Sequence, residues 1–284
     1  MFDMEKLGAN IMRHRKAKGL TQMQLANELG ISFQAVSNWE RGQSAPDISK
    51  LSELSAVLDV SIDEILGNPR TAEIIKQVES DRVPVLDPRE AVEVAPILEE
   101  KQMDDLVVNI AESMTLSDII ELAPYLSEKA LGDMARRLTP DAVNFSELED
   151  LAPYVDEDTI TNLALKAVKH GCSLSQLEDI APYLSEEGMD ALINKVISDP
   201  SFSAKLSDLE ELAPYASEGC IDRATLELVR RGGSMSALED VAAYLSSEGA
   251  NAVARELMKQ KNLKALKSII HYIDDDALDD FFDD

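Results

Sequence analysis

The sequence is poor in cysteine, aromatic residues and histidine, and each shortage excludes a class of protein. Its 284 residues include two cysteines, Cys172 and Cys220, which are far apart, so we expect no disulfide framework and a reducing, cytoplasmic location. Aromatic residues make up 5% of the chain against 45% hydrophobic residues, which favours packed helices over a β-sandwich. The three histidines are scattered and share no metal-ligand spacing with the cysteines, so we predict no metal site.

Long apolar runs and catalytic motifs are also missing. No stretch of 18 or more apolar residues is present, which predicts no transmembrane helix and no membrane partner. The first residues lack the apolar core of a signal peptide. There is no glycine-rich phosphate loop and no nucleophile elbow, and abundant carboxylates without burial are no evidence of acid–base chemistry. We therefore predict that the protein is not an enzyme and needs no cofactor.

The net charge of −27 is shared unevenly along the chain. Residues 1–70 hold 8 Lys or Arg and 9 Asp or Glu, whereas the remaining residues hold 19 and 45. We expect residues 71–284, which are this acidic, to repel DNA and anionic membranes. If the chain binds DNA, its N-terminal part must do so, with basic groups gathered on one face.

Five short helices are predicted within residues 4–66. The first runs from Met4 to Lys18, with apolar and basic residues on separate sides. The residues expected to cap the four following helices are Thr21, Ser32, Asp47 and Ser61. The second and third helices are separated by a tight turn at Gly30, which is the helix-turn-helix pattern.

The motifs of this segment occur densely and in order. They are Gly19-Leu20-Thr21-Gln22, Leu25-Ala26, Leu29-Gly30-Ile31-Ser32, Val36-Ser37-Asn38-Trp39-Glu40-Arg41-Gly42, Pro46 and Val60-Ser61-Ile62-Asp63-Glu64-Ile65-Leu66. Together they resemble the Cro/C1-type repressor family over about 60 residues, and such a string is far more specific than one short motif.

The resemblance implies that the third helix enters the major groove of double-stranded DNA. The residues expected to contact bases are Ser32, Phe33, Gln34, Ser37 and Asn38. Gln34 and Asn38 lie four apart on one helix face, and their amides can pair with adenine. The alternative for this amide pair is a solvated surface, and the alternative for Phe33 is packing against a neighbouring subunit.

The resemblance also implies phosphate contacts and a structural ion pair. Gln22, at the start of the second helix, is the expected phosphate contact, with Lys18 and Arg41 as further candidates. Arg15 and Glu40 occupy positions where the family often builds an ion pair. Because such domains usually act in pairs on inverted half-sites, we expect a homodimer.

Residues 68–90 are predicted to be a linker between two domains. Gly67-Asn68-Pro69 closes the first domain, and residues 71–79 could add one or two helical turns. Pro84 and Pro88 then bracket an irregular stretch in which proline interrupts helices. We therefore predict a DNA-binding domain over residues 1–67, a semi-stiff linker over 68–90 and a second domain over 91–284.

The second domain is built from internal repeats. The motif Ala-Pro-Tyr, or a relative of it, starts at positions 95, 123, 152, 181, 213, 242 and 270, at steps of 28 to 32 residues. All six tyrosines of the chain stand at this motif, which chance does not explain. These tyrosines are Tyr125, Tyr154, Tyr183, Tyr215, Tyr244 and Tyr272.

Each repeat is predicted to form two helices. Ser146 with Glu149 has the pattern of a capping box before a first short helix, and it recurs as Ser175 with Glu178, Ser207 with Glu210 and Ser236 with Glu239. Asp156 or Ser185 then opens a second helix. A pair of about 29 residues cannot bury its own apolar face, so the pairs must stack. The expected fold is therefore all-α, a five-helix domain followed by a HEAT-like α-solenoid.

Two surfaces of the repeats have alternative interpretations. The tyrosines either line a ligand groove or pack between repeats, and packing is favoured because every repeat carries one. The acidic pairs, such as Glu178-Asp179, could form a ladder that binds a basic partner. The alternative is a solvated face, which is favoured because the first acid of each pair is expected to cap a helix. The tail Asp274–Asp284 is either a fraying end or an acidic interaction segment, and fraying is favoured.

The leading functional hypothesis is a DNA-binding transcription regulator whose repeats sense a ligand or bind a protein. Peptide-pheromone regulators of Gram-positive bacteria join a similar N-terminal domain to helical repeats, which makes peptide sensing an analogy. The alternatives are a protein-interaction scaffold and an acidic body that mimics DNA and inhibits a basic partner.

Overall fold

The computed structural model describes residues 3–168 and 172–274. His170 and the tail beyond Asp274, which the sequence predicts to fray, lie outside the described residues. The backbone contacts divide the chain into two compact units, residues 1–138 and 139–284, and each is described by itself. Throughout the described residues the regular secondary structure is helical, which confirms the predicted all-α class.

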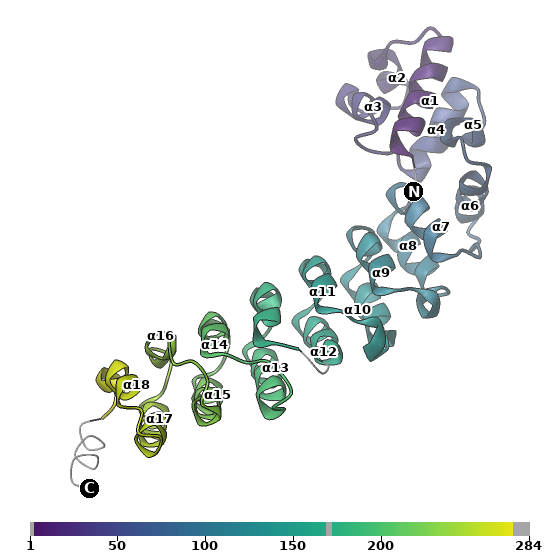
Figure 1. Cartoon of the computed structure of the whole chain (residues 1–284). Coiled ribbons are helices and arrows are strands. Elements are labelled where there is room, and N and C mark those ends of the chain that lie inside the picture. Colours follow the sequence, from purple (N-terminus) through teal and green to yellow (C-terminus); the bar gives the residue numbers. More distant parts are fainter. Residues whose placement is uncertain (1–2, 169–171, 275–284) are drawn as a thin grey trace. The chain divides into compact units, whose positions relative to one another are not determined.

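The first 66 residues of unit 1 form the five predicted helices (Figure 1). They are α1 (Met4–Ala17), α2 (Gln22–Glu28), α3 (Phe33–Glu40), α4 (Ile48–Leu58) and α5 (Ile62–Leu66). The side chains of Thr21, Ser32, Asp47 and Ser61 accept hydrogen bonds from the first turns of α2 to α5, as predicted.

The rest of unit 1 begins inside the predicted linker. Asn68 caps α6 (Pro69–Glu79), which buries Ala72, Ile74 and Ile75, so this part of the segment is a packed helix. The chain is irregular only between α6 and α7 (Pro88–Val94). The unit ends with η1 (Ala95–Ile97), α8 (Glu100–Val107), η2 (Ala111–Ser113), α9 (Leu116–Leu122), η3 (Ala123–Tyr125) and α10 (Glu128–Arg137).

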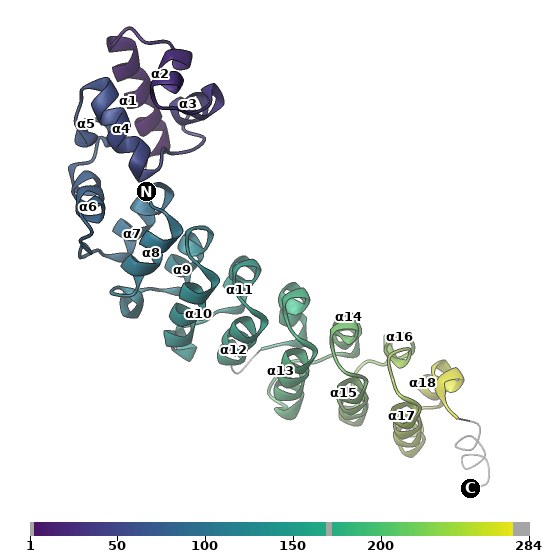
Figure 2. The same cartoon turned by 180° about the vertical axis from the view of Figure 1, so that it is seen from behind.

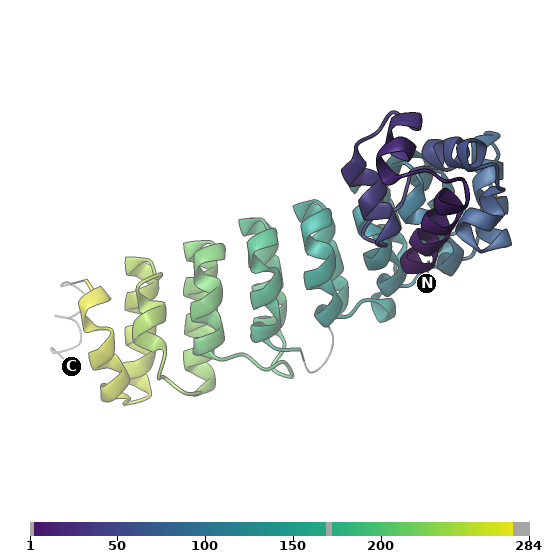
Figure 3. The same cartoon turned by 90° about the horizontal axis from the view of Figure 1, so that it is seen from above.

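Unit 2 is a stack of helix pairs (Figures 2 and 3). Its elements are η4 (Pro140–Ala142), α11 (Phe145–Leu151), η5 (Ala152–Tyr154), α12 (Glu157–Ala167), η6 (Leu174–Tyr183), α13 (Glu186–Ser198), α14 (Leu206–Leu212), η7 (Ala213–Tyr215), α15 (Glu218–Arg231), α16 (Leu238–Ala242), α17 (Ser247–Lys259), α18 (Leu263–Ser268) and η8 (Ile270–Tyr272). The first helices of successive pairs contact one another, and so do the second helices α12, α13, α15 and α17. This stacking buries the apolar stripes that a single pair leaves open, as the repeat analysis predicts.

The predicted capping boxes at the start of the first helices are wrong. α11 starts at Phe145, η6 at Leu174 and α14 at Leu206, so the predicted caps Ser146, Ser175 and Ser207 lie inside their helices. At these three starts a buried apolar side chain extends the helix upstream of the serine. α16 starts later, at Leu238, with Ala237 and not Ser236 at its N-cap. The second helices do begin at the predicted caps Asp156 and Ser185.

Hydrogen bonds between successive repeats hold the second helices together at both ends. Near their N-termini, Asp190 on α13 accepts from the amide of Ser217, the N-cap of α15, at 2.9 Å. Near their C-termini, Lys195 Nζ donates to the carbonyl of Leu165 at 2.5 Å, and Gln260 Nε2 donates to that of Val229 at 2.9 Å. These donors satisfy terminal carbonyls that a helix cannot pair by itself.

Candidate nucleic-acid interface

The turn between α2 and α3 has the geometry of a helix-turn-helix. Thr21 and Gln24 form a capping box at the start of α2, and Ser32 caps α3. Gly30 between them has a φ of +62°, a left-handed conformation that suits glycine. Leu25 and Val36 are fully buried, so one face of each helix belongs to the core and the opposite faces are left to solvent.

A buried ion pair joins the ends of α1 and α3. The Arg15 guanidinium binds the Glu40 carboxylate with both Nε and Nη2, the latter to Oε2 at 2.9 Å, and the two side chains are 9% and 2% exposed. Arg15 Nη1 also donates to the carbonyl of Leu20 at 2.6 Å. The hydrogen bonds that Arg15 donates to the Glu40 carboxylate raise the pKa of Arg15 above its ordinary value. This pair sets the position of α3 against α1.

α1 also approaches α3 closely at Gly8. A Cβ atom at this position would lie 2.4 Å from the carbonyl oxygen of Trp39 and 2.9 Å from that of Glu40. Only a residue without a side chain allows this contact, so Gly8 is part of what holds α3 in place.

The outer face of α3 presents the side chains that sequence analysis assigns to bases. Ser32, Phe33 and Gln34 are exposed, and 43% of the Phe33 side chain is open to solvent. Gln34 Nε2 donates to Oδ1 of Asn38 at 3.2 Å, and Arg41 Nη2 donates to the same oxygen at 2.8 Å. Ser37, on the next turn from Gln34, is half-buried. The structure thus brings two amides and one guanidinium together on one helix face.

The predicted phosphate contacts are less uniform. Gln22 is half-buried, and its Nε2 donates to Glu40 Oε2 at 2.7 Å, so its side chain belongs to the Arg15–Glu40 cluster. Lys18 is exposed and lies 3.3 Å from Asp59. Arg41 is exposed beside Asn38. The link from Gln22 to Glu40 could not be predicted from the sequence, because these residues are 18 positions apart and meet only in the fold.

Comparison with known proteins agrees with this geometry. Residues 11–65 match the model of a helix-turn-helix family. An HTH-type transcriptional regulator of Sinorhizobium fredii, y4dJ, is 43% identical over 66 residues, which cover 23% of this chain and 86% of that protein. The chain belongs to this helix-turn-helix family. This match confirms the predicted resemblance to the phage-repressor type of helix-turn-helix.

Other helix-turn-helix relatives are covered less fully. The CTXphi transcriptional repressor RstR of Vibrio cholerae is 35% identical over 68 residues, 24% of this chain and 61% of that protein. The next two relatives match over 49% and 26% of their lengths. The family match therefore describes the N-terminal part of the chain.

Solved structures align with most of this chain, but their structural similarity to it is low. The SHP pheromone receptor Rgg2 of Streptococcus dysgalactiae aligns with 94% of this chain and 97% of its own, at 15% identity and a TM-score of 0.20.

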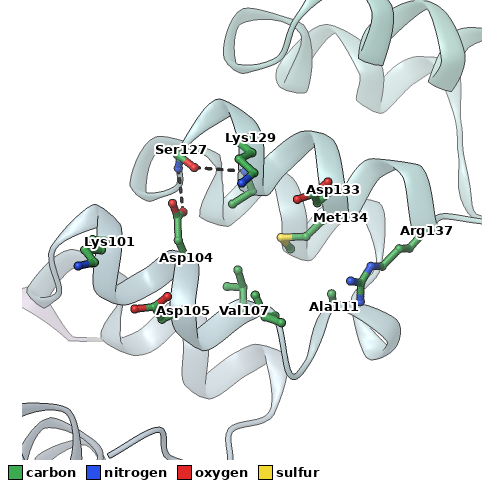
Figure 4. A pocket seen from close by; sticks show the side chains of 12 residues that line it. Lys101, Asp104, Asp105, Val107, Ala111, Ser127, Lys129, Asp133, Met134 and Arg137 are labelled. Carbon is green, nitrogen blue, oxygen red and sulfur yellow. Dashed lines mark hydrogen bonds between the residues drawn. The ribbon is translucent and has the colours of Figure 1, made fainter. Parts of the chain in front are cut away.

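Unit 1 also holds a cavity that the sequence did not indicate (Figure 4). It has a volume of about 290 Å³ and lies between α8 and α10, with both acidic and basic side chains at its wall. They include Lys101, Asp105, Lys129, Asp133 and Arg137. Asp133 and Arg136 are paired at 2.6 Å, which lowers the pKa of Asp133. The mixed charges of the wall favour no particular ligand.

The remaining chemistry of the described residues is sparse. Within residues 3–168 and 172–274, no group of three or more His, Cys, Asp or Glu is arranged to hold a metal ion. Cys172 and Cys220 are buried free thiols. None of the described helices is long and apolar enough to cross a membrane.

The repeat tyrosines are partly buried and partly exposed. Tyr125 in unit 1 is half-buried, but the five tyrosines of unit 2 are each 37–41% exposed. The alanine two positions before the tyrosine is buried at Ala152, Ala181, Ala213 and Ala242, whereas each of these tyrosines keeps part of its surface in contact with solvent.

Proposed function

We propose that this protein is a sequence-specific DNA-binding transcription regulator. Residues 1–67 bind double-stranded DNA, and the helical repeats of residues 91–284 act as a sensor or protein-interaction domain joined through residues 68–90. The observation that carries the proposal is the exposed face of α3, where Gln34, Asn38 and Arg41 contact one another on a helix braced by a buried ion pair. Amide and guanidinium groups on a rigid helix are what base and phosphate recognition in the major groove needs.

The mode of binding follows from the same geometry. Gln34 and Asn38 contact bases together with Ser32, Phe33 and Ser37, while Arg41, Lys18 and Gln22 contact phosphates. The chain acts as a homodimer on two half-sites about one helical turn apart. It works in the cytoplasm, without a cofactor and without catalysing a reaction.

The experiment selects sequences from a random duplex DNA library with the full-length protein at a fixed, stated salt concentration. The Gln34→Ala/Asn38→Ala variant tests the base contacts. The matched control, Gln77→Ala/Asn109→Ala, removes the same two kinds of amide outside residues 1–67. We expect the wild type and the control to enrich one palindromic motif and the α3 variant to lose it. No motif from the wild type, or the same motif from the α3 variant, would reject the proposal.

A second candidate function is an interaction scaffold or peptide-sensing regulator, in which the acidic repeats bind a protein or peptide. The five exposed tyrosines of unit 2 favour it, because exposed aromatic residues are enriched at binding surfaces. A wild type that selects no DNA but captures a polypeptide through unit 2 would replace the regulator by the scaffold.

A further inference from the structure

The exposed tyrosines of unit 2 form a row along one edge of the stack. Tyr154, Tyr183, Tyr215 and Tyr244 occupy the same position at the turn between the two helices of successive repeats, and Tyr272 follows at η8. The turns are held in register because Asp190 and Asp222 each bind the N-cap serine just beyond the next repeat's tyrosine. The row is thus a regular feature of the fold.

The sequence segments that carry these tyrosines are acidic and contain no base, while Arg223 of α15 reaches back to the helix start beside Gly219. The four helix–turn segments 145–158, 174–187, 206–218 and 238–248 hold three to six Asp or Glu each and no Lys or Arg. Basic residues of unit 2 gather instead at the opposite ends of the second helices, as at Lys195, Arg231 and Lys259. One edge of the stack is therefore strongly negative.

The acids of this edge lie close enough to influence one another between repeats. Burial raises the pKa of Glu178 above its ordinary value, and the charges of Asp208 and Glu211 in the next repeat raise it further. Glu149, Glu178 and Glu239 cap no helix, since the predicted capping boxes are not formed, so these exposed carboxylates are available to a partner.

We propose that this edge of unit 2, the tyrosine–acid edge, binds an extended Arg- or Lys-rich polypeptide segment. The exposed rings offer faces for cation–π contact with guanidinium or ammonium groups, and the neighbouring carboxylates supply the opposite charge. Neighbouring helices pack about 8–10 Å apart, so the row spans roughly 40 Å, and an extended chain of about 12 residues covers it. This inference rests on the interaction role in the proposed function and names the partner's chemistry.

The test measures fluorescence anisotropy of a labelled peptide with the full-length protein. The probe is four repeats of Arg-Gly-Ser, and the control probe replaces each Arg with Glu. We expect the basic probe to bind, the acidic probe not to bind, and binding to weaken as salt increases.

Four matched variants separate a specific edge from general charge attraction. Tyr183→Ala/Tyr215→Ala/Tyr244→Ala keeps the net charge, and we expect it to weaken binding by at least about tenfold. Glu178→Gln/Glu211→Gln/Glu239→Gln should weaken binding similarly, while Glu28→Gln/Glu100→Gln/Glu112→Gln, which removes the same charge elsewhere, should weaken it far less. The triple Tyr→Phe variant keeps the rings and should retain most of the binding, which controls for misfolding.

Two outcomes would overturn the inference. Either the tyrosine variant binds the basic probe as tightly as the wild type, or the two charge variants weaken binding equally. The Gln34→Ala/Asn38→Ala variant should bind the probe normally, so failure of DNA recognition and failure of peptide binding are distinguishable.

Discussion

Asp222 on α15 holds Ser246, the residue that caps α17. The amide of Ser246 donates to Asp222 Oδ1 at 3.0 Å, and the Ser246 hydroxyl donates to Oδ2 of the same carboxylate. The hydroxyl oxygen also accepts from the amide of Gly249 at 2.9 Å. One carboxylate therefore links the start of a helix to the preceding repeat.

Asp222→Ala should lower the free energy of unfolding of unit 2 by about 1.5–3 kcal/mol, because a charged acceptor is removed and a half-buried amide loses its partner. Urea denaturation of the full-length protein measures this. Asp240→Ala removes an exposed acid of α16 and should change stability by less than about 0.5 kcal/mol. Equal losses in the two variants would contradict the structural role of Asp222.

Gly249 also belongs to this contact, because its Cα lies close to the Asp222 carboxylate. A Cβ atom there would lie 1.9 Å from Asp222 Oδ1, so Gly249→Ala must displace the carboxylate or the helix, at a cost of about 1–3 kcal/mol. Gly219→Ala is the control, since a Cβ there meets no atom closer than Arg223 Nη1 at 3.5 Å. Inside a helix, that change should be neutral or stabilise by up to about 1 kcal/mol. If Gly249→Ala is as stable as Gly219→Ala in the same urea titration, the close approach is absent.

Glu40→Ala should destabilise the N-terminal helices by about 3 kcal/mol or more, because it leaves the Arg15 guanidinium buried without its carboxylate. Trp39, the only tryptophan, is buried beside Glu40, so its fluorescence during urea unfolding reports on these helices. Lys18→Ala breaks the exposed pair with Asp59 and should cost less than about 1 kcal/mol. A Glu40→Ala loss no larger than that of Lys18→Ala would reject the bracing role.

Glu178→Gln should make unit 2 more stable at pH 7, and the gain should vanish as the pH falls. The pKa of Glu178 in the fold lies above its ordinary value of 4.5, so the folded chain holds this proton more tightly than the unfolded chain. The contribution of the acid is therefore most favourable below its unfolded pKa and is lost as the pH rises through the folded pKa. Urea titrations of both proteins between pH 7 and pH 4.5 measure the difference, and a gain that grows toward low pH would contradict it.

Both cysteines should be inert in the folded protein. Burial raises the pKa of Cys172, and burial with the nearby Asp190 carboxylate raises the pKa of Cys220 to about 12, so little thiolate forms at pH 8. A colorimetric disulfide reagent should react with neither thiol in native buffer and with both in urea. Rapid labelling of native protein would show that unit 2 opens easily. Because both thiols lie in unit 2, this assay complements Trp39 fluorescence, which reports on unit 1.

Local signals in the sequence located most of the helices. The predicted helices begin at the expected caps Thr21, Ser32, Asp47 and Ser61. A cap depends on a hydrogen bond from a backbone amide to a side-chain oxygen only three residues earlier, so the local sequence is enough to predict it. The same local rule failed at Ser146, because the helix includes the buried side chain of Phe145 and begins two residues upstream of the predicted start. Packing against the neighbouring helices decided where that helix starts, and the positions of the serines do not report on this packing.

The sequence by itself determined the all-α class, the helix-turn-helix and its family, and the repeat of about 29 residues, since all of these depend on residues near one another in the chain. The tertiary structure alone decided that Gln22 binds Glu40, that Asp222 holds Ser246 and that the unit 2 tyrosines are 37–41% exposed. These relationships join residues of separate helices or depend on which side of a turn the core covers. Only the packing of helices against one another sets those distances and exposures.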